Sequence, residues 1–141
     1  MKSKRNWTLI LFMSVICFIG ACQSEEEINY DRYYTTGKQL YESRCGNCHN
    51  NDGSGLALLY PPLTDTTYLQ SNKNKLACII KNGLNGEITV GGKTYNGQMP
   101  AQQDLSDIEI AEIITYITNS FGNKQGLKKT EDVNKDLKNC Q

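Results

Sequence analysis

Cys45-Gly46-Asn47-Cys48-His49 sets the architecture of this chain, because two thiols and an imidazole stand within five residues. The C-x-x-C-H pattern is typical of covalent haem attachment. Both thiols lie on one short turn and can reach two vinyl groups on one porphyrin edge, while the imidazole is presented to the iron. A C-x-x-C pair also occurs in thiol redox motifs and zinc sites. His49 is the one histidine of the chain, so zinc has no second imidazole.

A methionine supplies the candidate for the second axial ligand. Met1 and Met13 fall in a segment that we expect to be removed on export, which leaves Met99. Met99 lies in the sequence GQMP at positions 97–100, between a glycine and a proline that favour a loop. A lone methionine often fills a core, but core methionines usually lie on periodic apolar segments. We therefore predict Met99 as the sixth ligand of the iron.

From about residue 34 to 121 the chain resembles the class I c-type cytochromes, the small monohaem electron carriers. Gly37, Leu40 and Tyr41 precede Cys45 as in the first helix of that family, and YPPL at 60–63 resembles its proline-rich loop. The resemblance implies an all-α cytochrome c fold, with three to four core helices around one covalently attached haem c. A small β-hairpin would precede the methionine loop.

The same resemblance implies the roles of the site residues. Cys45 and Cys48 would bind the haem covalently, and His49 and Met99 would be its axial ligands. The carbonyl of Pro61 would accept the proton of His49 Nδ1 and so fix the imidazole ring.

The N-terminus has the features of a bacterial export signal. Residues 1–5 are basic, an apolar run covers residues 7–19, and Gly20 and Ala21 precede Cys22. This pattern predicts a signal peptide over 1–21, too short for an ordinary membrane span. Its end resembles a lipobox, which implies lipidation of Cys22; the alternative is an ordinary signal peptide with a spare cysteine. We expect a lipid-anchored protein on the periplasmic side of a bacterial membrane.

The acidic residues after Cys22 predict a solvated tether over 22–33, followed by a cytochrome domain at 34–123 and an extension at 124–141. The order Ser-Glu-Glu-Glu at 24–27 also resembles a signal for the outer cell surface. Removal of 1–21 takes three of the 15 basic residues and none of the 15 acidic ones, so the net charge becomes −3. This balance argues against nucleic-acid binding.

Periodicity and turn residues predict the elements of the domain. Helices are expected at 31–44 and 71–82, and a hairpin at 87–95 turns at two consecutive glycines. Ser106 and Glu109 form a capping box for a last core helix that ends at Gly122. By resemblance, Gly37 and Tyr116 would meet where this helix crosses the first one.

The extension carries a cysteine that can pair with one in the domain. Residues 130–139 predict a short helix capped by Thr130, which could place Cys140 opposite Cys78. Export permits a disulfide. The alternative is a mobile tail with a free terminal thiol.

Four lysines form the basic stretch of the chain, and electrostatic steering of an acidic redox partner is one interpretation. They are Lys73, Lys75, Lys81 and Lys93. A solvated surface without a binding role is the other interpretation.

These observations favour an electron carrier, not an enzyme, which exchanges electrons with a terminal oxidase, a reductase or a dehydrogenase. A haem sensor or peroxidase-like protein is the alternative, and it requires Met99 to be off the iron. A third interpretation is a non-haem thiol protein that uses Cys45 and Cys48 as a redox pair.

Overall fold

In the computed structural model, which describes residues 24–140, the first helix is α2 (Glu25–Arg44). Ser24 caps it, since its Oγ accepts a hydrogen bond from the Glu27 backbone N–H at 3.3 Å. Glutamates in the first turn also suit the positive end of the helix dipole. The first helix therefore begins at Glu25 and not at residue 31 as expected, and the residues predicted to form a solvated tether are its first, mostly exposed turns. The signal peptide and Cys22 lie outside the described residues.

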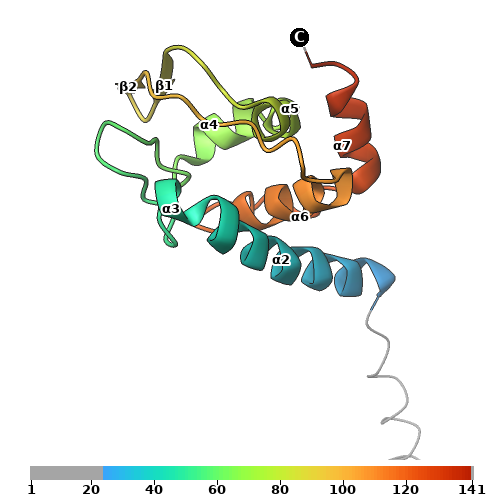
Figure 1. Cartoon of the computed structure of the whole chain (residues 1–141). Helices are drawn as coiled ribbons and strands as arrows, with labels where there is room; N and C mark the ends of the chain where they lie inside the picture. The colour runs from blue at the N-terminus through green and yellow to red at the C-terminus, as the bar shows by residue number, and fades with distance from the viewer. Residues whose placement is uncertain (1–23, 141) are drawn as a thin grey trace, which may run out of the picture.

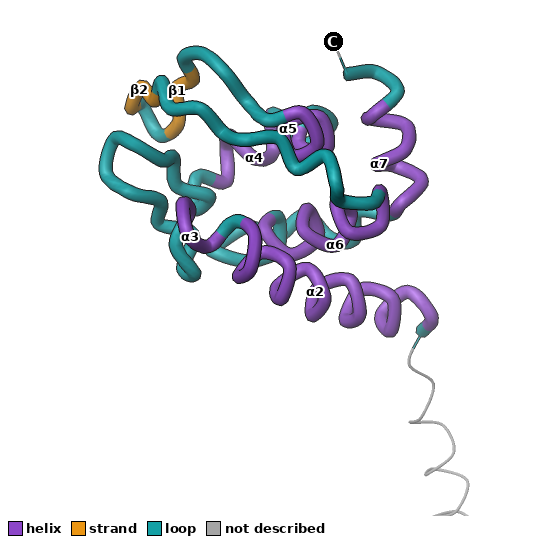
Figure 2. Tube along the Cα trace, viewed as in Figure 1, coloured by secondary structure: helices purple, strands orange, loops and turns teal. Residues whose placement is uncertain are grey.

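The remaining elements follow α2 along the chain and are labelled in Figure 1. They are α3 (Gly46–His49), α4 (Thr66–Ser71), α5 (Leu76–Asn82), β1 (Ile88–Val90), β2 (Lys93–Tyr95), α6 (Asp107–Ile117) and α7 (Thr130–Leu137). Figure 2 shows long loops between α3 and α4 and between β2 and α6. The predicted helical fold with one small antiparallel hairpin is confirmed. Among residues 24–140, no helix combines the length and apolar character that crossing a bilayer requires.

The crossing of α2 over α6 forms the centre of the core. Gly37 allows it, because a Cβ atom there would overlap the backbone carbonyl of Glu112 and lie 3.0 Å from Tyr116 Cβ. The ring of Tyr116 packs against Tyr41 and Phe121, with centroids 5.3 and 5.6 Å away. The predicted contact between Gly37 and Tyr116 is therefore present.

The hairpin and the start of α6 form as their sequences predict. Ile88 pairs with Tyr95, and the two turn glycines, Gly91 and Gly92, both have the positive φ that a primed turn requires. At α6, Ser106 and Glu109 form the capping box, in which Glu109 Oε2 accepts from the Ser106 backbone N–H at 2.8 Å. The chain is thus directed out of the hairpin, through the methionine loop and into α6.

The helix expected over residues 71–82 is instead divided, because α4 ends at Ser71 and α5 begins at Leu76. Asn72 Nδ2 donates to the Tyr68 carbonyl at 2.9 Å, so a side chain satisfies this carbonyl at the end of α4. Gly83, with φ of 76°, ends α5 as expected.

Helix α6 also ends earlier than expected, at Ile117 and not at Gly122. The hydroxyl of Thr118 donates to the Ile114 carbonyl at 2.6 Å, and Asn119 Nδ2 donates to the Thr115 carbonyl at 2.7 Å. These polar side chains satisfy the last carbonyls and end the helix.

The C-terminal extension is packed against the domain. Val133 of α7 is fully buried, and the sulfur atoms of Cys78 and Cys140 are bonded, with their Cα atoms 5.6 Å apart. Thr130 does not cap α7 as expected, because the residue before it takes that position. The Thr130 hydroxyl instead forms a hydrogen bond with the Tyr33 hydroxyl at 2.8 Å.

Candidate haem site

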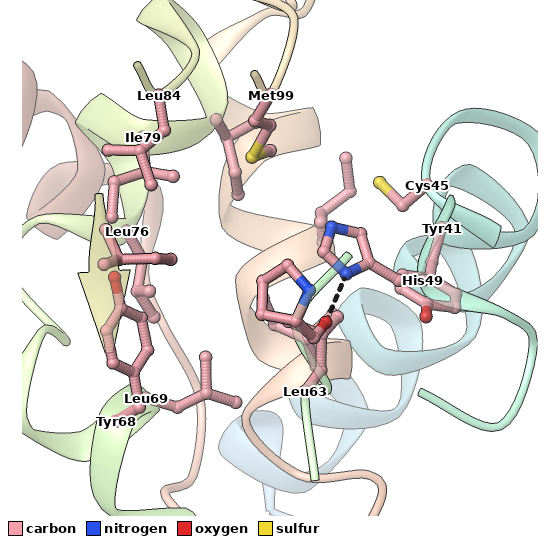
Figure 3. A pocket seen from close by; sticks show the side chains of 15 residues that line it. Tyr41, Cys45, His49, Leu63, Tyr68, Leu69, Leu76, Ile79, Leu84 and Met99 are labelled. Atoms are coloured by element: carbon pink, nitrogen blue, oxygen red, sulfur yellow. Dashed lines mark hydrogen bonds between the residues drawn. The ribbon is translucent and has the colours of Figure 1, made fainter. Parts of the chain in front are cut away.

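His49 is held in one orientation at the end of α3. Its Nδ1 lies 3.0 Å from the carbonyl oxygen of Pro61, and a carbonyl can only accept, so Nδ1 carries the proton. Figure 3 shows the ring directed into a cavity. Burial lowers the pKa of His49, which the bond to Pro61 partly opposes, so the imidazole is neutral at pH 7. Its Nε2 therefore faces the cavity as a free electron-pair donor.

Cys45 and Cys48 lie on the same helical turn as His49. The backbone N–H groups of Cys48 and His49 both donate to the Cys45 carbonyl, at 3.1 and 2.9 Å. Burial raises the pKa of Cys45 to about 11, with a further contribution from Cys48. A thiol redox pair needs a lowered pKa, so this thiol does not suit that chemistry. Across residues 24–140, no three His, Cys, Asp or Glu side chains gather into a metal-binding group, and zinc therefore has no ligand set.

The cavity beside His49 is almost entirely apolar. It has about 590 Å³ of empty space, part of which opens to solvent. Nine leucine and isoleucine side chains contribute to its walls: Leu63, Leu69, Leu76, Ile79, Ile80, Leu84, Ile88, Ile113 and Ile117. A second cavity of about 440 Å³ adjoins it and shares His49 and Met99 with it. Cys45 lines the larger cavity and Cys48 the smaller, so the two cysteines reach both parts of one slot.

Met99 enters the slot from a loop, on a different segment from His49 (Figure 3). Its backbone N–H donates to the Leu84 carbonyl at 2.9 Å, and the Leu84 N–H donates to the Met99 carbonyl at 3.0 Å. The backbone also passes close to Gly83, where a Cβ atom would overlap the Met99 carbonyl. Met99 is thus fixed by backbone hydrogen bonds and by a position that only glycine allows.

The donor set fits a c-type haem. An apolar slot suits the macrocycle, an imidazole and a thioether suit its iron, and two thiols on one turn suit two vinyl groups. No charged side chain lines the larger cavity. The residues expected to bind haem, Cys45, Cys48, His49 and Met99, are thus brought together, and Pro61 contacts His49 as expected.

Comparisons with known proteins agree with this site. The cytochrome c family model matches residues 34–120. Cytochrome c-552 of Thermus thermophilus is 30% identical over 65% of this chain and 72% of its own length. Cytochrome c-554(548) of Halomonas halodenitrificans is 39% identical over 51% of this chain and 78% of its own length. The fructose dehydrogenase cytochrome subunit of Gluconobacter japonicus is 35% identical over 70% of this chain but only 21% of its own length.

The chain belongs to the cytochrome c family, as a class I c-type cytochrome. It therefore has the cytochrome c fold and a covalently bound haem c, and its activity is electron transfer.

The sequence did not reveal how Lys81 is used. Its ammonium group donates to the carbonyls of Gln103 and Leu105, at 2.9 and 2.6 Å, in the loop that follows Met99. Lys81 is thus hydrogen-bonded to the protein's own backbone, which favours the interpretation without a binding role for this lysine; the docking role stays a prediction. The other three lysines of that set are exposed.

Tyr41 is a second residue whose role the sequence did not show. Its ring lines the slot, and its hydroxyl donates to the Asn50 carbonyl at 2.6 Å, directly after the C-x-x-C-H turn. Burial raises the pKa of Tyr41, so it stays a hydrogen-bond donor at every working pH. Tyr41 lies one helical turn before Cys45 in the sequence, and this position could have suggested its hydrogen bond to Asn50.

Proposed function

We propose that this protein is a membrane-anchored monohaem electron carrier, with Cys45 and Cys48 as covalent attachment points and His49 and Met99 as axial ligands. The observation that carries the proposal is the joint presence of these four side chains on one apolar slot. The haem supplies one-electron chemistry at its iron.

The protein's own residues keep that chemistry to electron transfer. The carbonyl of Pro61 orients the imidazole of His49, and the pairing with Leu84 holds the thioether of Met99 in place. With haem bound, His49 and Met99 would both ligate the iron and would leave no open position for a substrate. The aliphatic walls exclude water and so favour the redox state of the haem iron that carries less charge, the reduced state. A thioether ligand favours the same state. The sensor or peroxidase-like alternative needs a displaced Met99, and no contact around Met99 favours that.

The experiment that tests the ligand assignment is the substitution Met99→Ala in protein matured with haem. Loss of the weak far-red sulfur-to-iron absorption band and a new carbon monoxide adduct of the reduced protein are expected. Retention of the band would exclude Met99 as a ligand.

The partner surface is proposed to lie beside Cys48. The loop of residues 53–64 contains no charged residue, and it exposes Leu56, Leu58 and Leu59 by 47%, 65% and 61%. Leu59 also lines the smaller part of the slot together with Cys48. An exposed apolar patch of this kind marks an interaction site. A terminal oxidase, a reductase or a dehydrogenase with an apolar contact surface is the expected partner.

The membrane anchor is proposed to be a lipid on Cys22 after removal of residues 1–21. Helix α2 starts at Glu25, so only two residues, 23 and 24, separate the lipidated cysteine from the helix. At 1.5 Å per residue, the 20 residues of α2 span about 30 Å. In this arrangement α2 is a spacer with the anchor at one end and the C-x-x-C-H turn at the other. The site then faces a partner on the periplasmic side, or outside the cell if the protein is surface-exposed.

A further inference from the structure

The C-terminal extension lies beyond the part of the chain that matches the cytochrome c family, residues 34–120, yet it is a fixed part of the structure. The side chain of Val133, in α7, is completely buried. Lys128 Nζ and Asp136 Oδ2 form an ion pair at 2.6 Å, and both side chains are largely buried, with 16% and 11% exposed. The Lys128 backbone N–H also donates to Thr115 Oγ1 of α6 at 3.1 Å, and the Thr130 hydroxyl is hydrogen-bonded to Tyr33 of α2 at 2.8 Å, so α7 has a defined place on the domain.

Helix α7 is connected to α5 by a covalent bond. Cys140 follows α7, and its sulfur is bonded to that of Cys78 in the middle of α5. The next two residues of α5, Ile79 and Ile80, line the haem slot. The disulfide therefore fixes the helix that forms the wall of the slot.

Helix α5 and Leu84, which follows it after Gly83, together hold both sides of Met99. On one side, Leu84 pairs with Met99 through the two backbone hydrogen bonds described above. On the other, the Gln102 N–H donates to the Ile80 carbonyl at 3.0 Å, and Lys81 Nζ donates to two carbonyls further along the loop. A shift of α5 would therefore move the methionine loop with it.

We propose that the C-terminal extension positions Met99 as the axial ligand, through the Cys78–Cys140 disulfide, α5 and Lys81. Loss of any link in this series increases the fraction of molecules in which the sulfur of Met99 has left its position. The inference rests on the proposed function, since it requires Met99 to be an iron ligand. It assigns a positioning role to Lys81 and to a segment outside residues 34–120, the part of the chain that matches the family model.

The test uses the haem-loaded, full-length protein and two independent changes. One is Cys78→Ser combined with Cys140→Ser, and the other is Lys81→Gln. The measurements are the affinity of the oxidised protein for imidazole and the rate at which the reduced protein binds carbon monoxide. Both report how often Met99 is displaced, and thermal unfolding is followed in parallel.

Lys81→Gln is expected to raise the carbon monoxide rate and the imidazole affinity about tenfold, the effect of losing one hydrogen bond to a charged group. Removal of the disulfide is expected to raise both values as well, because α5 is then no longer bonded to the extension. Lys81→Arg keeps donors in place and should restore most of the wild-type behaviour. Lys73→Gln removes the same charge from an exposed position near α5 and should leave both values unchanged.

Equal ligand-binding values in wild type and both variants, with only the thermal midpoint lowered, would overturn the inference and leave the extension a purely structural addition. If the disulfide variant does not fold, Lys81→Gln alone decides. A wild-type protein without a sulfur-to-iron band would instead refute the proposed function itself, before any variant is compared.

Discussion

Replacement of Gly37 by alanine is the most direct probe of the helix crossing that supports the haem site. An added Cβ would lie 2.5 Å from the backbone carbonyl carbon of Glu112 and 3.0 Å from Tyr116 Cβ, where ordinary contacts begin at 3.4 Å. Neither neighbour is the flexible end of a side chain. Helices α2 and α6 must therefore separate by about 1 Å.

The size of the effect follows from two opposing contributions. Overpacking of a well-packed interior costs about 1–3 kcal/mol or more, and separation also loosens the contact between the rings of Tyr41 and Tyr116, for about another 1 kcal/mol. Alanine gains about 1 kcal/mol over glycine in a helix interior. The net loss is about 2 kcal/mol, which corresponds to a fall of roughly 8 °C in the midpoint of a domain of this size.

Thermal unfolding followed by circular dichroism measures this change. Thr35→Ala is the matched control, because Thr35 is exposed on the same helix and its replacement changes helix propensity without a clash. We expect the control to unfold at or slightly above the wild-type midpoint. A Gly37→Ala protein that behaves like this control would refute the close helix crossing.

Three further changes test other parts of the structure. Ser106→Ala should lower the free energy of unfolding by about 1 kcal/mol at pH 7, measured by thermal unfolding. Hydrogen bonds from Ser106 lower the pKa of Glu109, so the loss of stability should become smaller as the pH falls below about 4. A loss that stays constant with pH would contradict this. Leu58→Asp should raise the KM for electron transfer to a membrane partner about tenfold. Ile28→Asp, also at an exposed position, should leave this KM unchanged. Equal effects of the two substitutions would refute the proposed docking surface. Cys22→Ser should move the protein from the membrane to the soluble fraction after cell fractionation, and unchanged membrane association would exclude the lipid anchor.

Much of the site could be predicted because its chemistry is local in sequence. The C-x-x-C-H motif places two thiols and an imidazole on one turn, and this turn forms in α3 as expected. Met99 was found from a different kind of evidence, its position between loop-forming residues. The hairpin and the capping box at Ser106 were likewise predictable, since each depends on neighbouring residues alone.

The features that were missed depend on contacts between distant segments or on competition between local signals. Lys81 was grouped with three other lysines of a basic stretch, but its hydrogen-bond partners lie more than 20 residues away in the loop after Met99. The start of α2 was misplaced because an acidic run is typical both of a solvated tether and of a capped first turn. The hydrogen bonds that Ser24 accepts from the backbone N–H groups of Glu27 and Ile28 distinguish the two.

The optical spectrum of protein matured in a haem-attaching host tests the central claim most directly. The oxidised form should show the weak far-red sulfur-to-iron band, and carbon monoxide should not shift the spectrum of the reduced form. This result would establish His49 and Met99 as the two axial ligands of an electron carrier. A carbon monoxide shift without the far-red band would place Met99 off the iron and contradict the account.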